Sequence, residues 1–334
     1  MPASANFHKY NITAVIPAYH VERNIESVLC ELPTYLRYII VVDDASPDKT
    51  SELVKAMARR DKRIVLIRHE QNQGVGGAMI TGFKKSLELG AQVIVKVDGD
   101  GQMDTAHLPA LLAPLIKGKA DYVKGNRFRD FGSLKQMPLV RRTGNLGLSF
   151  LTKAATGYWN CFDPTNGFFA IRADALAQLP LDKIDHGYYF ETSMLSYLYL
   201  LDAYVLDVPI PARYRGEISS MSIRRVLFEF PYKLTRTLWR RIVLKYFLYD
   251  FSMMSVYLLT GIPLLLFGLI FGITKWIHYA ELGVAAPTGT VILPTLSVIL
   301  AIQILLSAIE IDVNAAPRKP ISASHLSNRN VTHR

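Results

Sequence analysis

The stretch Val93-Ile94-Val95-Lys96-Val97-Asp98-Gly99-Asp100 places an almost wholly apolar run directly before two carboxylates that one glycine separates. The run is short and rich in β-branched side chains, which predicts a buried strand. Two carboxylates at a strand end can ligate a small hard cation such as Mg²⁺ or Mn²⁺, but an Asp-Gly pair also forms ordinary turns. The segments around this stretch decide between the two interpretations.

Similar apolar runs alternate with amphipathic helical segments along residues 10–125. We expect strands at Ile12–Ile16, Ile39–Val42, Val65–Ile67, Val93–Val97 and Tyr122–Val123, and helices near 24–36, 49–60, 76–89 and 105–117. This alternation favours right-handed crossovers, and it predicts an α/β fold with a Rossmann-like, mostly parallel sheet and flanking helices. Ligands of such sheets bind beyond the carboxyl ends of the strands, where Asp98 and Asp100 are expected.

The formal net charge of +10 is concentrated in two segments of the 334-residue chain. Residues 1–212 are nearly balanced, with 24 Lys and Arg against 22 Asp and Glu. In contrast, residues 213–245 hold nine basic side chains against two acidic ones, and residues 313–334 hold four against none. Both basic segments flank apolar stretches. The charge therefore indicates a lipid membrane as partner, and we expect no nucleic-acid partner.

The two apolar stretches, Phe251–Ile273 and Thr288–Ile309, contain no charged residue. Each can cross a bilayer core of about 30 Å as a helix. Two helices buried in a soluble core are the alternative, but uninterrupted apolar stretches of this length are uncommon there. Basic residues precede the first stretch and follow the second, so we expect a C-terminal two-helix transmembrane hairpin in the cytoplasmic membrane, with the N-terminal domain and both termini in the cytoplasm. The apolar run Ile12–Ile16 is too short for a signal peptide, so we expect no secretory leader.

A basic amphipathic segment, Ser222–Tyr249, precedes the first apolar stretch. One helical face carries the apolar side chains Ile223, Leu227, Phe230, Leu234, Leu238 and Ile242. We expect this face in the lipid headgroup layer and a division into two helices at Pro231; a solvated cationic helix is the alternative. The predicted organisation is a domain over residues 1–215, interfacial helices over 216–249, two transmembrane helices over 250–312 and a cytoplasmic tail over 313–334.

Five motifs follow one another along the chain. They are Ile16-Pro17-Ala18-Tyr19-His20, Val42-Asp43-Asp44-Ala45-Ser46-Pro47-Asp48-Lys49-Thr50, Asn72-Gln73-Gly74-Val75-Gly76-Gly77-Ala78, Asp98-Gly99-Asp100-Gly101-Gln102 and Gly125-Asn126-Arg127. In this order they resemble glycosyltransferase family 2, the inverting enzymes with the GT-A fold that use nucleotide sugars; His20 stands where the family usually has Asn. The glycine-rich motif alone is no dinucleotide fingerprint, because Met79 replaces its third small residue.

The resemblance implies roles for residues around the nucleotide sugar. We expect Pro17, Ala18, Tyr19, Asp43 and Asp44 around the base and ribose, Gly74 and Gly77 near the nucleotide, and Gln102 beside the diphosphate. Asp98 and Asp100 are expected to hold Mg²⁺ or Mn²⁺, and Arg127 to bind a phosphate. Local alternatives are helix capping for Asp44 and Asp48, a flexible helix entry for the glycines and a structural ion pair for Arg127.

Two further motifs are similar to those of polyprenyl-phosphate sugar transferases within this family, the group of dolichol-phosphate mannose synthase and bactoprenol glucosyltransferase. They are Asp163-Pro164-Thr165-Asn166-Gly167-Phe168 and Arg213-Tyr214-Arg215-Gly216-Glu217-Ile218-Ser219-Ser220. The resemblance implies acceptor contacts from Asp163, Asn166, Gly167, Arg213, Arg215 and Ser219. Which of the two arginines meets the acceptor phosphate stays open, and the Lys that often follows the Ser is absent.

The predicted activity is inverting transfer of one sugar from a nucleotide sugar, by resemblance a UDP-sugar, to polyprenyl phosphate. Glu191 is the carboxylate available as general base for a hydroxyl acceptor. A phosphate monoester ionises without such help, because its second pKa is about 6, and Glu191 would then orient the sugar or cap a helix. The alternatives are transfer to a hydroxyl of a lipid or glycan, and a membrane-anchored protein that binds nucleotide sugars without catalysis. The sequence leaves the identity of the sugar and the presence of a homo-oligomer open.

Overall fold

The computed structural model of the chain describes residues 6–126, 139–162, 166–210 and 223–321. The chain divides into two compact units. The first comprises residues 1–238 together with 317–334, and the second comprises residues 239–316. The C-terminal segment returns to the first unit, because the backbone N–H of Ile321 donates a hydrogen bond to Oδ2 of Asp121 at 2.9 Å.

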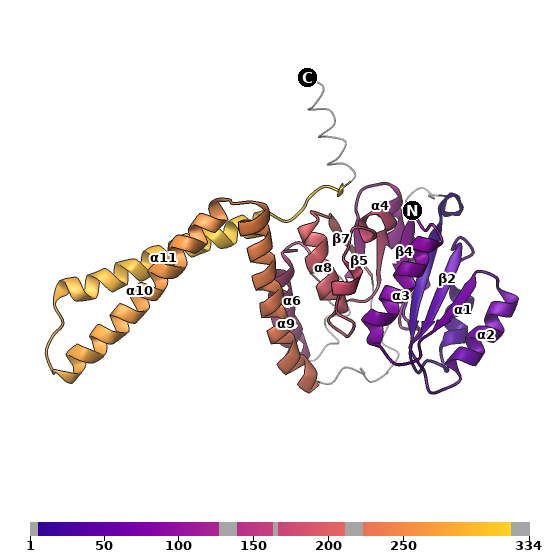
Figure 1. The fold of residues 1–334 in the computed structure, drawn as a ribbon, viewed down its shortest axis with the longest axis horizontal. Coiled ribbons are helices and arrows are strands. Elements are labelled where there is room, and N and C mark those ends of the chain that lie inside the picture. Colours follow the sequence, from indigo (N-terminus) through magenta and orange to yellow (C-terminus); the bar gives the residue numbers. More distant parts are fainter. Residues whose placement is uncertain (1–5, 127–138, 163–165, 211–222, 322–334) are drawn as a thin grey trace, which may run out of the picture. The chain divides into compact units, whose positions relative to one another are not determined.

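A seven-stranded sheet forms the centre of the first unit (Figure 1). In spatial order its strands are β3 (Ile64–Arg68), β2 (Tyr38–Asp43), β1 (Ile12–Ala18), β4 (Val93–Lys96), β6 (Phe169–Arg172), β5 (Tyr122–Asn126) and β7 (Val205–Pro209). β6 is antiparallel to β4 and β5, and the other neighbouring pairs are parallel. Each of the five predicted strands overlaps an observed one, so the prediction of a mostly parallel α/β sheet is confirmed.

Helices and short helical turns connect these strands. They are η1 (Phe7–Lys9), α1 (Ile25–Glu31), α2 (Thr50–Arg60), α3 (Gly74–Glu88), η2 (Thr105–His107), α4 (Leu108–Ile116), α6 (Leu139–Thr156), α7 (Ala173–Leu176), η4 (Leu181–Lys183) and α8 (Phe190–Leu200). Ala14 and Ile16 of β1 belong to a core shared with α1, α2 and α4, whereas Val15 belongs to a core shared with α3 and α8. Because both faces of the sheet are covered, its strands are apolar at consecutive positions.

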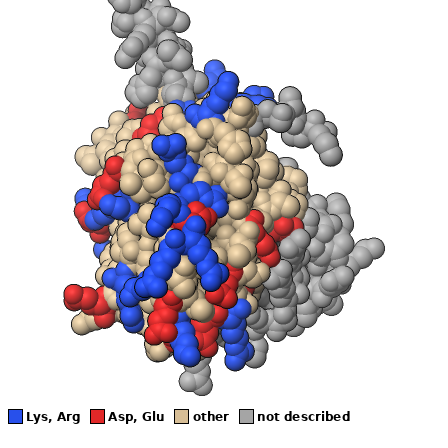
Figure 2. All heavy atoms as spheres, turned by 90° about the vertical axis from the view of Figure 1, so that its right-hand side faces the viewer, with Lys and Arg blue, Asp and Glu red and all other residues tan. Residues whose placement is uncertain are grey.

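The order of the strands fixes where a ligand site is expected. From β1 the chain passes to β2 and β3 on one side, and it then returns to add β4 on the other side of β1. At such a reversal the connections on either side of the carboxyl ends of β1 and β4 lead in opposite directions, which leaves a crevice between them. Figure 2 shows Lys and Arg interspersed with Asp and Glu on one face of the molecule, in keeping with the near-balanced charge of residues 1–212.

The second unit contains two long apolar helices, α10 (Met253–Glu281) and α11 (Thr288–Asn314), which pack against each other. Both are long and apolar enough to cross a membrane, each with a mean hydropathy of 2.3. Only 11% and 22% of their apolar windows are buried, whereas a pair of core helices in a soluble protein would be largely covered. The structure thus has the hairpin of candidate spans that the sequence predicts.

The helix before the hairpin differs from the expectation. α9 (Ile223–Val243) continues through Pro231 without a break, and a π-helical turn, η5 (Leu244–Tyr249), follows it. The expected division at Pro231 is therefore wrong. Phe230 and Leu234 are buried against Ala155 and Tyr189, so part of the apolar face that we expected in the lipid headgroups packs on the protein instead. The sequence left this face without a partner, because the partner comes from distant α6 and from the residue before α8.

Candidate active site

The predicted site residues at the ends of β1 and β4 lie together. A Cβ atom added to Gly99 would lie 3.5 Å from the carbonyl oxygen of Pro17, so the Asp-Gly-Asp turn packs against the end of β1. The Asp98 side chain is 28% exposed. Oδ1 of Asp100 accepts a hydrogen bond from the backbone N–H of Gln102 at 2.9 Å. The turn that carries the two carboxylates therefore lies beside Pro17, at the reversal of strand order.

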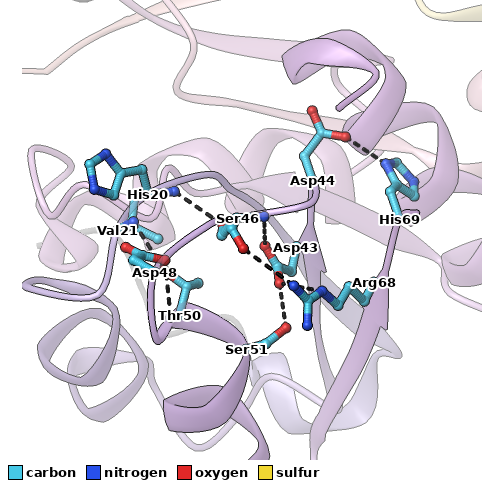
Figure 3. A network of polar contacts seen from close by, with 10 residues as sticks. All are labelled: His20, Val21, Asp43, Asp44, Ser46, Asp48, Thr50, Ser51, Arg68 and His69. Carbon is cyan, nitrogen blue, oxygen red and sulfur yellow. Dashed lines mark hydrogen bonds and ion pairs between the residues drawn. The ribbon is translucent and has the colours of Figure 1, made fainter. Parts of the chain in front are cut away.

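Beyond β1 the chain turns sharply at His20, whose φ is +57°. The backbone N–H of His20 donates to Oγ of Ser46 at 3.1 Å, which ties this turn to the loop after β2 (Figure 3). Ala18 is buried, but the Tyr19 side chain is 52% exposed. An exposed aromatic ring just after β1 is suited to stack against a planar base.

Asp43, at the end of β2, is fully buried and bonded within the protein (Figure 3). Its Oδ1 accepts the backbone N–H of Ser46 at 2.9 Å, and its Oδ2 accepts the hydroxyl of Ser51. The guanidinium of Arg68 lies 3.5 Å from the same carboxylate. These contacts hold the loop between β2 and α2 in place.

Asp44 is also buried, and it organises the start of α3. Its Oδ1 lies 2.7 Å from Nδ1 of His69 and accepts the backbone N–H of Gln73 at 2.8 Å. Its Oδ2 accepts the N–H of Gly74 at 2.7 Å. Asp44 thus holds the start of α3, a helix distant in sequence, although the N-cap residue of that helix is Gln73. The expected contacts of Asp43 and Asp44 with a base and ribose stay predictions.

Asp48 lies just before α2, whose N-cap residue is Lys49, and its side chain holds the start of that helix. Its Oδ1 accepts the backbone N–H of Thr50 at 3.1 Å, at the start of α2, and its Oδ2 accepts that of Glu22 at 3.2 Å. Burial acts to raise the pKa of Asp48, but the hydrogen bonds from Thr50 and Glu22 outweigh it and lower the pKa below its usual value. Asp48 thus fastens the loop after β1 to the loop after β2.

The glycines at the start of α3 lie against the chain's own backbone. The N–H groups of Gly76 and Gly77 donate to the carbonyl oxygen of His186 at 2.7 and 3.2 Å. A Cβ atom at Gly76 would lie 2.7 Å from the carbonyl carbon of His186, too close for any larger residue. The small residues allow this close approach, an explanation that the sequence did not suggest. Nucleotide contacts of Gly74 and Gly77 stay predictions.

A buried lysine, which the sequence analysis missed, connects Asp98 with Glu191. Lys96 is only 2% exposed, and its Nζ lies 2.7 Å from Oδ1 of Asp98 and 3.4 Å from Oε1 of Glu191. Burial alone would lower the pKa of Lys96, but the attraction of the two carboxylates raises it overall. The one polar residue in the apolar run Val93–Val97 was the available signal.

The expected acceptor motif contributes Gly167 and Asn166 to this region. A Cβ atom at Gly167 would overlap Nζ of Lys96 and would lie 3.1 Å from Oδ2 of Asp98 and 3.5 Å from Oε1 of Glu191. Asn166 is buried, and its Nδ2 donates to the carbonyl oxygen of Gly125 at 2.7 Å. Asn166 therefore supports the loop, whereas Gly167 faces the charged groups. Arg127, Asp163, Arg213, Arg215 and Ser219 lie outside the described residues.

The family model described as glycosyl transferase family 2 matches residues 13–179, half of the chain. The chain belongs to this family. It is 38% identical over 181 residues to UDP-N-acetylglucosamine--dolichyl-phosphate N-acetylglucosaminyltransferase of Methanococcus voltae, covering 50% of this chain and 72% of that protein. It is 32% identical over 202 residues to undecaprenyl-phosphate mannosyltransferase of Micrococcus luteus, covering 60% of this chain and 82% of that protein. The protein is thus a glycosyltransferase, as the motifs predicted.

Solved structures show the same fold. Glucosyl-3-phosphoglycerate synthase from Mycobacterium tuberculosis, crystallised with Mn²⁺, UDP-glucose and phosphoglyceric acid, has a TM-score of 0.54 and 20% sequence identity, and the match covers 72% of this chain and 85% of that one. The crystal structure of this enzyme with UDP gives the same values. The likeness confirms the GT-A fold for the glycosyltransferase.

The carboxylates of this glycosyltransferase fit a divalent cation that the substrate helps to hold. Within the described ranges no group of three His, Cys, Asp or Glu side chains could hold a metal ion alone. Mg²⁺ and Mn²⁺ prefer oxygen ligands, and Mg²⁺ is commonly bound by one or two carboxylates together with substrate phosphates. Asp98 and Asp100 supply two carboxylates just after β4, so their chemistry fits such a shared site.

Proposed function

We propose that the protein transfers a single sugar, with inversion, from a nucleotide sugar to polyprenyl phosphate at the cytoplasmic face of the membrane. The observation that carries this proposal is the combination of a family 2 catalytic domain with an apolar helical hairpin. The relatives support the acceptor class, because two that match over more than two thirds of their length are named for transfer to dolichyl or undecaprenyl phosphate. A UDP-sugar donor is favoured, since the first of them is named for one.

The proposed chemistry assigns the donor to the crevice between β1 and β4. Tyr19 would stack on the base, and Asp98 and Asp100 would hold Mg²⁺ or Mn²⁺ beside the diphosphate, with Gln102 nearby. The cation, when bound, neutralises charge on the leaving nucleoside diphosphate. Arg127 is proposed as a further phosphate partner, because a guanidinium can contact two oxygens at once.

The acceptor is proposed to attack as a phosphate anion. One of its oxygens would form a bond to the anomeric carbon from the face opposite the diphosphate, and the bond to the diphosphate would break with its electron pair, which inverts the configuration. A phosphate monoester is largely ionised at neutral pH, so no residue needs to remove a proton. The contact of Glu191 with Lys96 gives this carboxylate a role without proton transfer. Asp163, Asn166, Gly167, Arg213, Arg215 and Ser219 remain the proposed acceptor residues, Asn166 through its support of the loop.

Chain connectivity supports catalysis on the same side as both ends of the hairpin. α9 leads from the first unit into the hairpin, and after α11 the chain returns to the first unit at Ile321. An even number of spans between two attachments to one domain requires both ends on one side of the membrane. The excess of basic residues in 213–245 and 313–334 favours the cytoplasmic side.

The test is a transfer assay with purified full-length protein in lipid nanodiscs. Polyprenyl phosphate and the matching polyprenol would be offered with a panel of UDP- and GDP-sugars and Mn²⁺, and the lipid products weighed by mass spectrometry. We expect a mass increase of one sugar on polyprenyl phosphate and none on polyprenol. A product on polyprenol alone would favour the hydroxyl-acceptor alternative. Binding of nucleotide sugar without any product from either lipid would favour the non-catalytic alternative.

A further inference from the structure

Lys96 occupies a place in the fold where a charged side chain is costly. It belongs to β4, between the buried residues Val95 and Val97, and faces Phe169 across the sheet register. Transfer of an ammonium group from water to a protein interior is unfavourable unless opposite charges compensate it. The two carboxylates that do so, Asp98 and Glu191, come from different elements. The lysine therefore depends on both of them for its place.

The charged groups of Lys96, Asp98 and Glu191 all lie close to Gly167. Oδ2 of Asp98 and Oε1 of Glu191 each lie within 3.5 Å of the point where a Cβ atom of Gly167 would stand, and Nζ of Lys96 would overlap that atom. Without a cation between them, two carboxylates this close repel each other. The glycine leaves the space in which the ammonium joins them.

The charges at the site determine what it attracts. Asp98, Asp100 and Glu191 contribute three negative charges and Lys96 one positive charge. A divalent cation brings this sum to zero, whereas the same site without the lysine would stay negative. An acceptor phosphate is itself an anion, so a more negative net charge of the site weakens its binding.

We propose that Lys96 is a positioning residue that fixes the carboxylates of Asp98 and Glu191 beside Gly167 and sets the charge of the site, so that it admits a divalent cation and an anionic phosphate acceptor together. This inference rests on the proposed function for the identity of the acceptor. The expected effect of Lys96 on cation binding does not depend on that function. It gives Glu191 the task of holding the lysine in place.

The test compares wild type with Lys96→Met, Glu191→Gln and the double variant, all as full-length protein in nanodiscs. Mn²⁺ binding is measured from the electron paramagnetic resonance signal of free Mn²⁺, without acceptor and with UDP at one fixed concentration, because the two carboxylates share the cation with a diphosphate. The same UDP concentration without protein gives the background. Lys96→Met removes a positive charge and should tighten Mn²⁺ binding by about tenfold, and Glu191→Gln should weaken it. The double variant has the same site charge as wild type and should return towards its affinity.

The second measurement is the acceptor constant of the transfer reaction. Lys96→Met should raise the KM for polyprenyl phosphate by about tenfold or more, because the more negative site repels the phosphate, and the double variant should recover at least a third of this loss. If Lys96→Met only damaged the fold, binding of both Mn²⁺ and polyprenyl phosphate would be weaker. Both would then be weaker still in the double variant. Lys124→Met is the matched control: Lys124 is also fully buried on this sheet, but its Nζ donates to the backbone carbonyl of Asn166. It should lower the melting temperature without tightening Mn²⁺ binding.

The outcomes separate this inference from the proposed function. A Mn²⁺ affinity that does not rise in Lys96→Met overturns the role of Lys96, whether or not sugar reaches polyprenyl phosphate. If Lys96→Met does not fold, Lys96→Arg and Glu191→Gln carry the test: Lys96→Arg keeps the charge, so its Mn²⁺ affinity must stay within threefold of wild type while that of Glu191→Gln falls. If the Mn²⁺ affinities follow the expected order but no sugar reaches polyprenyl phosphate, the proposed role of Lys96 is supported. Only the proposed acceptor, polyprenyl phosphate, is then contradicted.

Discussion

Arg241 and Asp312 form a bidentate ion pair, although they are 71 residues apart in the sequence. Nη1 of Arg241 lies 2.6 Å from Oδ1 of Asp312, and Nη2 lies 2.9 Å from Oδ2. Both side chains are buried, and the hydroxyl of Tyr246 donates to the same carboxylate at 2.7 Å. The pair joins the end of α9 to the end of α11, so it fastens the base of the hairpin.

Breaking this pair should destabilise the second unit strongly. Removal of one partner leaves an uncompensated buried charge, which costs about 3–5 kcal/mol, whereas replacement of both partners by apolar residues costs far less. We expect Asp312→Leu to lower the melting temperature in detergent and the Arg241→Met/Asp312→Leu double variant to restore most of it. An equal fall of the melting temperature in the single and double variants would show that the pair stabilises the protein through its packing and not through its charges.

Asp100→Asn should abolish sugar transfer and leave the fold intact. The substitution removes a charged ligand of the proposed cation without changing the volume of the side chain. Asp104→Asn is the matched control, because Asp104 lies four residues further on and caps η2 through the backbone N–H of Ala106 at 3.1 Å. Transfer rates in Mg²⁺ and Mn²⁺, together with melting curves, check the prediction. A near-normal transfer rate in Asp100→Asn would show that Asp100 is not a ligand of the cation.

Gly167→Ala should reduce transfer by about a hundredfold or more, the range that a small misplacement of reacting groups costs. The added methyl group would overlap Nζ of Lys96 and press on the carboxylates of Asp98 and Glu191. Gly147→Ala serves as control, because a Cβ atom there meets nothing within 4 Å and the residue lies in α6. In a helix this change stabilises by up to about 1 kcal/mol. Wild-type rates in both variants would contradict the crowding at Gly167.

These relationships show what the sequence could and could not predict. Strands β1 to β5 and helices α2 to α4 were predictable, because their apolar periodicity is local. The residues of the Asp98–Lys96–Glu191 cluster come from β4, its exit and α8, so no local pattern connects them. The internal bonds of Asp44 were likewise hidden, because its partners follow β3 and begin α3. Antiparallel β6 escaped prediction since it is short and follows a loop rich in polar residues.

Ala45→Gly should stabilise the protein by about 1 kcal/mol. Ala45 has φ +59°, a left-handed conformation that a side chain with a Cβ atom adopts at a cost and glycine adopts freely. Ala56→Gly is the control of opposite sign, because Ala56 is exposed within α2, where glycine costs about 1 kcal/mol. Urea unfolding of the two variants measures both changes. A loss of stability in Ala45→Gly would show that entropy of the unfolded chain outweighs the strain at this turn.

Cysteine labelling in intact cells tests the proposed membrane orientation. Cys30 is exposed and must first be replaced by serine, while Cys161 is buried. Val284→Cys lies in the connection between α10 and α11, with 56% of its side chain exposed, and Lys319→Cys lies beyond α11. If the basic segments stay in the cytoplasm, a membrane-impermeant maleimide should label position 284 from outside, and position 319 only after permeabilisation. The reverse pattern would put the first unit outside, away from a cytoplasmic pool of nucleotide sugar. Labelling of both positions before permeabilisation would mean that the hairpin does not span the membrane.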